Sequence, residues 1–290
     1  MIYDVTHVTR FSYGATVELT NGVLRLTPRS ENGQEVERVV IATDPVWELL
    51  NERRDSFGNR ITALRIDKPH RQLSITATSR VRVDRPPVAT GGPTWESVAA
   101  EAVGFGSLTE DSPAVALYPS RRIALFEDAT RYARESFAAR RPICDAALEL
   151  TRRIHADFTY DPDATEITTP ASEAFDRRRG VCQDFANIMI AGLRGIALPA
   201  LYVSGYIRTI PPPGKARLAG GDASHAWVSL WCGSAYGWKD YDPTNALPVQ
   251  NEHIVVARGR DYSDVAPTEG MVLSSGRQNL EVEVDVLEVE

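Results

Sequence analysis

Alternating hydrophobic and polar positions open the chain. Between residues 3 and 13 an apolar or aromatic side chain recurs at nearly every second position, from Tyr3 and Val5 to Phe11 and Tyr13. A period of two is typical of a β-strand with one buried face. These patterns predict an all-β domain over residues 1–85. Its further strands, separated by turn-forming clusters, are expected at residues 23–27, 37–42, 61–66 and 73–83.

The pattern changes after this domain. Proline and glycine pairs mark residues 86–120 as a linker or irregular connection. Beyond it, apolar residues recur every three or four positions, as in amphipathic helices, and two strand patterns follow. Helices together with strands over residues 121–270 predict an α+β core. The helical segments are residues 123–137, 147–158 and 182–195, and the strands are residues 200–207 and 223–231.

Apolar and acidic residues alternate at the end of the chain, between Leu280 and Val286. This is the pattern of a strand that exposes one face. We expect residues 271–290 to pair within a sheet, and the N-terminal β domain is the candidate partner.

Charge and cysteine content narrow the classes of function. The 290 residues include 32 Lys and Arg against 39 Asp and Glu, a net charge of −7 without a long basic stripe, so neither nucleic acid nor a membrane is an expected partner. Three cysteines without a CxxC pair argue against a disulfide framework and a zinc site. The sequence shows no signal-peptide pattern and no apolar run of membrane length. We expect a cytoplasmic protein, and its oligomeric state stays open.

One cysteine has a reactive position. Cys182 follows a turn signal at Gly180 and begins the buried helix predicted from residue 182. Unpaired N–H groups and the helix dipole favour an anion at a helix N-terminus, which biases a thiol there towards the nucleophilic thiolate. Taken alone, a cysteine at a helix entrance is better explained as a small packing residue. Residues further along the chain change this interpretation.

A histidine and a carboxylate follow on two predicted strands. His225 lies on the strand that ends at Trp231, and a second strand runs from Tyr236 to Asp242. If the four residues after Trp231 form the hairpin loop, Trp231 faces Tyr236 and His225 comes opposite Asp242. Asp240 takes that place only if the loop shifts back over Trp231, a poor turn residue. Asp242 is therefore the first choice and Asp240 the reserve.

Thiol, imidazole and carboxylate are the three parts of a cysteine acyl-transfer site. Cys182 would attack a carbonyl carbon, His225 would take the thiol proton and later protonate the leaving amine, and Asp242 would orient the imidazole. The backbone N–H of Cys182 is one candidate donor to the oxyanion. Three side chains are further candidates, each with a structural role as the alternative: Tyr160, Gln183 and Trp227.

Several motifs in a fixed order carry a family resemblance. Together they resemble the bacterial transglutaminase-like cysteine peptidase family, and the similarity covers nearly the whole chain. In the core the motifs are residues 178–186, 202–206, 224–228, 237–245 and 259–267, and in the N-terminal region they are residues 25–29 and 55–59. One departure is residues 195–199, where the family moves more directly from Gly-Ile to Pro.

The resemblance implies a papain-like core in which a nucleophile helix packs on an antiparallel sheet. It also implies a Cys-His-Asp triad, which falls on Cys182, His225 and Asp242, and a peptide or protein amide as substrate. No cofactor or metal follows from it. Hydrolysis and transfer to an amine stay open, because the same triad serves both.

Two hypotheses follow from these observations. The favoured one is a cysteine protease, amidase or acyltransferase, and the alternative is a non-catalytic protein that binds a peptide in the same fold. A binding protein has no need of all three groups together. The loop at residues 210–223, just before His225, is our candidate for a selectivity element. The remaining cysteine and histidine residues that we interpret as structural are His7, His70, Cys144, His155 and His253.

Overall fold

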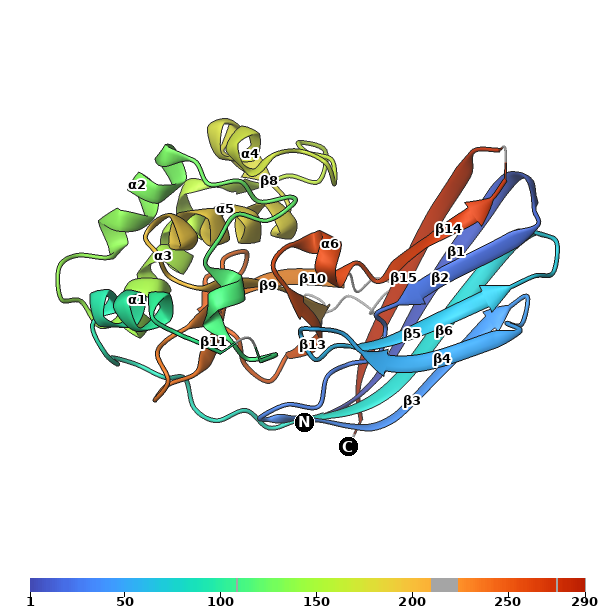
Figure 1. Ribbon diagram of the computed structural model, residues 1–290, viewed down its shortest axis with the longest axis horizontal. Helices are drawn as coiled ribbons and strands as arrows, with labels where there is room; N and C mark the ends of the chain where they lie inside the picture. The colour runs from blue at the N-terminus through green and yellow to red at the C-terminus, as the bar shows by residue number, and fades with distance from the viewer. Residues whose placement is uncertain (108, 210–223, 275, 290) are drawn as a thin grey trace, which may run out of the picture.

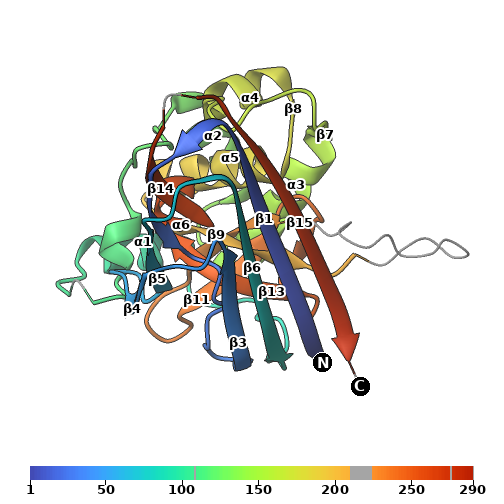
Figure 2. The same cartoon turned by 90° about the vertical axis from the view of Figure 1, so that its right-hand side faces the viewer.

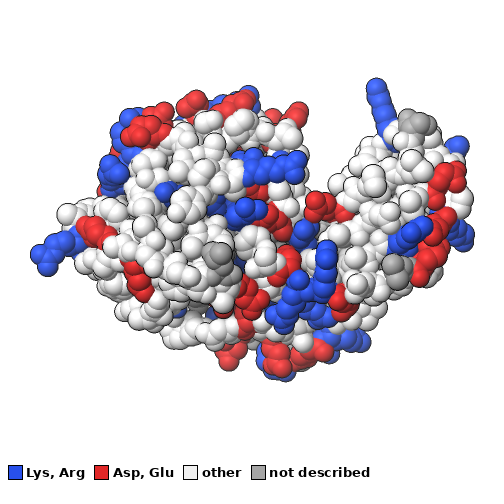
Figure 3. Space-filling view, in the orientation of Figure 1, with Lys and Arg blue, Asp and Glu red and all other residues white. Residues whose placement is uncertain are grey.

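The computed structural model describes residues 1–107, 109–209, 224–274 and 276–289. Its two parts are a β-sandwich and a mixed helical and β-sheet part (Figure 1). A notch separates the two parts in the space-filling view, and charged side chains of both signs gather at its base (Figure 3). Both chain ends lie at the same end of the β-sandwich (Figure 2).

The β-sandwich consists of two four-stranded sheets. The inward-facing side chains of both sheets share one hydrophobic core that includes Tyr13, Leu24, Ile66 and Ile75. The first sheet has the order β15 (Gln278–Val289), β1 (Ile2–Val17), β6 (His70–Val83) and β3 (Gln34–Asp44). The second has the order β14 (Thr268–Leu273), β2 (Leu19–Leu24), β5 (Arg60–Ile66) and β4 (Leu49–Arg54).

Two strands from the end of the chain complete these sheets. β14 pairs antiparallel with β2, and β15 pairs antiparallel with β1 from Ile2–Val289 to Tyr13–Gln278. The alternation at the start of the chain appears as alternating burial along β1. β4 has no counterpart in the sequence prediction, because most of its residues are polar or charged.

The connection between the two parts is more ordered than its composition predicts. It contains the helix α1 (Trp95–Val103) and the 3₁₀ helix η1 (Pro113–Ala116). Val98 and Ala102 of α1 are fully buried in the core of the second part. Proline and glycine at its ends concealed this short helix from the sequence pattern.

The second part is built on a five-stranded sheet that α5 (Cys182–Gly195) covers (Figure 1). Nearly every side chain of α5 after its first turn is buried, as expected for a helix enclosed on all sides. The other helices are α2 (Glu127–Ser136), α3 (Ile143–Asp157), α4 (Ala171–Arg177) and the short α6 (Tyr262–Val265). The strands, in order, are β12 (Leu247–Pro248), β11 (Trp238–Asp242), β10 (Ser224–Trp231), β9 (Ala200–Ile207) and β13 (His253–Gly259).

The hairpin between β10 and β11 is longer than predicted. Trp231 pairs with Trp238 instead of Tyr236, so six residues form the connection instead of four. The Cys232 N–H donates to the carbonyl oxygen of Gly237 at 2.9 Å, and Gly237 has a φ of 65° that favours glycine. The predicted register was therefore wrong by two residues.

This error leaves the choice of carboxylate intact. A shift of two residues keeps every side chain on the same face of the sheet, whereas a shift of one would turn it over. Continued along the strands, the observed register brings Asp242 opposite Trp227 and diagonal to His225. The side chains of His225 and Asp242 meet across this diagonal.

Side-chain amides of the β-sandwich pair with the outer edge of β13. The Gln34 amide donates to the Val255 carbonyl and accepts from the Val255 N–H, both at 2.8 Å. In the same way the Asn59 amide donates to the Arg258 carbonyl at 2.7 Å and accepts from its N–H at 2.8 Å. Backbone N–H and C=O groups on the open edge of β13 are thus hydrogen-bonded to side chains of the N-terminal part instead of to water.

Candidate active site

Cys182 is the first residue of α5, as the sequence predicts. The strand just before it, β8 (Arg179–Gly180), pairs in parallel with β7 (Thr159–Tyr160). The Asp184 carboxylate accepts the Val181 N–H at 2.8 Å and the Thr165 hydroxyl at 2.6 Å, which fixes the start of the helix. Cys182 is half-buried, whereas the helix is enclosed from Asp184 onward.

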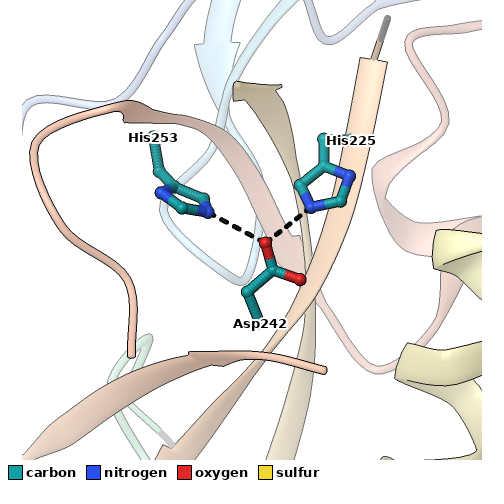
Figure 4. A group of neighbouring side chains, drawn as sticks. All are labelled: His225, Asp242 and His253. Carbon is teal, nitrogen blue, oxygen red and sulfur yellow. Dashed lines mark hydrogen bonds and ion pairs between the residues drawn. The ribbon is translucent and has the colours of Figure 1, made fainter. Parts of the chain in front are cut away.

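His225 and Asp242 form a direct hydrogen bond. The His225 Nε2 lies 2.8 Å from the Asp242 Oδ2, and both side chains are buried (Figure 4). Because an ionised carboxylate only accepts, Nε2 carries the proton, and Nδ1 of a neutral ring is left as an acceptor. This is the tautomer that a general base needs.

Asp242 is held by further donors from its own turn. Its Oδ1 accepts the backbone N–H groups of Thr244 at 2.9 Å and of Asn245 at 3.2 Å. The Asn245 side-chain amide donates to Oδ2 at 2.7 Å. The sequence Asp-Pro-Thr-Asn therefore forms a turn in which the chain folds back onto the aspartate.

Electrostatics favour a charged pair at this position. Burial opposes protonation of His225, but hydrogen bonds to Asp242 and Cys182 and the charges of both outweigh it and raise the pKa of His225 to about 10. Burial likewise acts to raise the pKa of Asp242, yet hydrogen bonds from His225 and His253 hold it far below its usual range. These directions describe an imidazolium paired with a carboxylate.

The reserve carboxylate has another partner. Asp240 forms a two-pronged ion pair with Arg258, at 2.8 and 2.9 Å, and accepts the Trp227 indole N–H at 3.1 Å. Burial acts to raise its pKa, but the charge and hydrogen bonds of Arg258 bring it to about 2. Asp240 therefore belongs to a buried ion pair and not to His225.

Comparison with known proteins gives the family. Residues 3–82 match the bacterial transglutaminase-like N-terminal region, and residues 130–243 match the transglutaminase-like superfamily. An uncharacterized protein of Mycobacterium tuberculosis is 40% identical over 99% of this chain and 93% of its own length. One from Mycobacterium leprae is 31% identical over 97% of both chains. The chain belongs to the transglutaminase-like superfamily.

The fold of this transglutaminase-like chain also has a solved counterpart. A crystal structure from Cytophaga hutchinsonii, described as a “putative cysteine protease”, has a TM-score of 0.75 with 21% sequence identity. The similarity covers 100% of this chain and 92% of that one. The predicted fold class, a papain-like α+β core preceded by a β region, is confirmed. Among the described residues, none of the helices combines the length and apolar character that crossing a membrane requires.

A fully buried tryptophan packs beneath the histidine of the transglutaminase-like core. The Trp227 ring lies 5.9 Å from the ring of His225, and its indole N–H is bonded to Asp240. Gly205 of β9, which pairs with His225 of β10, leaves room for the Trp227 ring. A Cβ on Gly205 would lie 2.3 Å from the Trp227 ring and 2.2 Å from the Ile254 carbonyl oxygen.

The three side chains that we considered as hydrogen-bond donors to the oxyanion differ in their contacts. The indole of Trp227 is engaged by Asp240, and the Gln183 amide donates to the Ile167 carbonyl at 3.2 Å. Tyr160 stands on β7, next to the strand that leads into Cys182, and its side chain is exposed. Burial of part of the ring and the charge of Cys182 raise the pKa of Tyr160, so its hydroxyl keeps its proton.

Two neighbours of Asp242 were missed as site residues by the sequence analysis. Asn245 ends the motif at residues 237–245 and had no predicted role, and His253 was interpreted as structural. The His253 Nε2 lies 3.0 Å from the same Oδ2 that His225 contacts (Figure 4). The Asp-Pro turn could have indicated Asn245. His253 lies on a strand whose pairing no local spacing predicts.

His225, Asp242 and His253 together could be considered as metal ligands, since one ligand atom from each lies within 4.8 Å of the others. Two features argue against this. Separations of 2.8 and 3.0 Å from each imidazole nitrogen to one oxygen are those of direct hydrogen bonds. A metal-bound histidine also donates its second N–H to an acceptor, and among the described residues the His253 Nδ1 has no partner.

The remaining candidates lie elsewhere. A cavity of about 370 Å³ between the two parts is lined by Arg85, Trp238 and Arg258 among others, and its lining does not include Cys182, His225 or Asp242. The proposed selectivity loop, residues 210–223, lies outside the described residues. The other histidines and cysteines make packing or hydrogen-bond contacts: His7 with Tyr206, His70 with Thr20, His155 with the Thr244 carbonyl, and Cys144 with Cys232.

Proposed function

We propose that this protein is a cysteine-dependent acyl-transfer enzyme that cleaves peptide or protein amide bonds through a thioester. The observation that carries the proposal is the position of His225. Its Nε2 is bonded to Asp242 at 2.8 Å, and a hydrogen bond to Cys182 contributes to its raised pKa. Cys182, His225 and Asp242 then act as nucleophile, general base and orienting carboxylate.

The reaction begins at the sulfur. The Cys182 thiolate attacks the amide carbon, and its proton resides on His225 Nδ1. When the tetrahedral intermediate collapses, the C–N bond breaks, His225 gives the proton to the leaving amine and a thioester remains. Water then attacks the thioester, giving one proton to His225, and the C–S bond breaks to release a carboxylic acid and regenerate the thiolate.

The oxyanion requires donors that are aimed at it before the reaction. The backbone N–H of Cys182, which has no acceptor within its own helix, is the first. We assign the second to the Tyr160 hydroxyl, because β7 and β8 bring it beside the nucleophile and its pKa is raised. Removing one such donor typically lowers kcat by about 10²–10³.

We favour hydrolysis over transfer to an amine because the half-buried Cys182 and exposed Tyr160 leave the thioester open to water. Three free cysteines, two of them buried against each other, suit a reducing compartment, and we assign the enzyme to the cytoplasm.

The test is a mass-spectrometric assay with a mixture of denatured proteins, with and without a primary amine. Hydrolysis adds water at the cleaved bond, whereas transfer incorporates the amine. Cys182→Ser, which keeps the size of the side chain, serves as the matched control. Cleavage that depends on Cys182 supports the proposal. Saturable peptide binding by both proteins without any turnover would instead favour the binding protein.

A further inference from the structure

His253 is placed on the far side of the carboxylate from His225. It is the first residue of β13, is 2% exposed, and contacts Asp242 through Nε2 at 3.0 Å. Figure 4 shows the two imidazoles approaching the same carboxylate oxygen from opposite sides. The Asp242 Oδ2 thus receives donors from His225, His253 and Asn245.

The protonation state of His253 follows from its surroundings. Asp242 can only accept, so the His253 Nε2 carries the proton, and Nδ1 is left as a lone pair without a partner among the described residues. The charged groups that face the ring are Asp242, His225 and Arg85. Burial outweighs the attraction of Asp242 and lowers the pKa of His253, so the ring is a neutral donor at neutral pH.

The strand that carries His253 is fixed by the N-terminal part. Arg85 donates to the His253 carbonyl oxygen at 2.7 Å and, through its other terminal nitrogen, to Gln34 at 3.1 Å. Gln34 in turn pairs with both backbone groups of Val255. Trp227 packs edge-on against the His253 ring, 5.3 Å away. Backbone and ring are therefore both restrained.

We propose that His253 is a positioning residue that fixes the Asp242 carboxylate for His225, and that Gln34 and Arg85 of the N-terminal part hold it in place. The inference rests on the proposed function of Cys182. By donating to the shared oxygen, His253 fixes the carboxylate rotamer and withdraws part of its negative charge. A neutral apolar ring of similar size could fill the space but could do neither.

The test compares His253→Phe, which keeps the volume, with His253→Gln, whose amide can donate at the Nε2 position. His70→Phe, at a buried histidine of the β-sandwich, is the matched control for the loss of a buried imidazole. Nitrogen-15 NMR of the imidazoles gives the tautomers and the titration of His225, and peptide hydrolysis gives kcat and KM.

We expect the pKa of His225 in His253→Phe to rise by about half to one pH unit, because the Asp242 carboxylate regains the negative charge that His253 withdraws. We also expect kcat to fall about tenfold, with KM unchanged, because His253 does not contact substrate. His253→Gln should restore both, and His70→Phe should change neither.

A folded His253→Phe protein with the parent His225 titration would overturn the inference. The unmodified protein offers a second test that no folding defect affects. There the His253 ring must be neutral and protonated on Nε2 at neutral pH, and an Nδ1-protonated or positively charged ring would contradict the proposal. Because NMR needs no turnover, a protein without hydrolase activity would refute the proposed function and still test this coupling.

Discussion

Two carboxylates lie within reach of His225, and only one of them is bonded to it. Asp240 and Asp242 lie two residues apart on the same face of β11, yet their partners differ completely. Asp240 is paired with the buried Arg258, and within the described part of the chain Asp242 receives donors only from uncharged or titrating groups. One carboxylate neutralises a permanent charge, and the other is available to an imidazole whose charge changes.

Replacing each carboxylate by its amide separates these roles. Asp242→Asn should lower kcat/KM of the folded protein by about 10²–10⁴, because His225 loses its tautomer and its charge partner. Asp240→Asn leaves the buried Arg258 with Glu31 as its remaining carboxylate partner, and the loss of the charged hydrogen bonds to Asp240 should cost about 1.5–3 kcal/mol of unfolding free energy while folded molecules keep their activity. Denaturant unfolding and kinetics on both variants check this. A stability loss in Asp242→Asn with full activity would reverse the assignment.

Part of this candidate site could be predicted from the sequence. Cys182 could be identified because a turn signal and a helical hydrophobic pattern meet at it, and His225 because it begins a strand pattern. Asp242 is the carboxylate that contacts His225 although the predicted register was wrong, since the two-residue error kept the face of the strand. His253 could not be found in this way, because its contact depends on β13 pairing with β9 and on the β-sandwich holding that strand.

Among the elements of the core sheet, β9 leaves space beside Gly205 for the ring of Trp227, which lies on the same strand as His225. Gly205 pairs with His225 on one side and with Val255 on the other. The missing Cβ lets the Trp227 ring lie across this position. The glycine is thus required for space, at the centre of a sheet where glycine is otherwise unfavourable.

Gly205→Ala should therefore be strongly destabilising. The added Cβ would meet backbone on one side and a fully buried ring on the other, and neither can move without disturbing β13 or Asp240. We expect a loss of at least about 2 kcal/mol of unfolding free energy. Gly106→Ala, where a Cβ meets nothing within 4 Å, is the matched control and should be near neutral. Equal unfolding midpoints for the two variants would contradict this packing.

At the scale of the whole molecule, the two parts share structure instead of being joined by a simple linker. Val284 and Val286 of β15 pack in one cluster with Tyr206 and Ile254 of the core sheet. The end of the chain therefore stabilises the sheet that carries His225 and His253. A domain boundary drawn along the sequence does not capture this, because β14 and β15 return to the β-sandwich after the core is complete.

Removing residues 278–290 tests this dependence. The truncation deletes β15, exposes the edge of β1 and removes Val284 and Val286 from the shared cluster. We expect a melting temperature lower by about 10 °C or more, since several buried aliphatic side chains are lost. Glu283→Ala breaks only an exposed ion pair with Arg10 and should change the unfolding free energy by less than about 1 kcal/mol. A truncated protein with the parent melting temperature would contradict the account.

The central claim is that His225 activates Cys182, and alkylation of Cys182 as a function of pH tests it most directly. Mapping the modified peptide by mass spectrometry separates Cys182 from the buried Cys144 and Cys232. With His225 protonated up to a pKa of about 10, Cys182 should react well below the titration range of a free cysteine, near pH 8.5, and His225→Ala should abolish this advantage. A thiol that reacts like free cysteine and is indifferent to His225 would contradict the account.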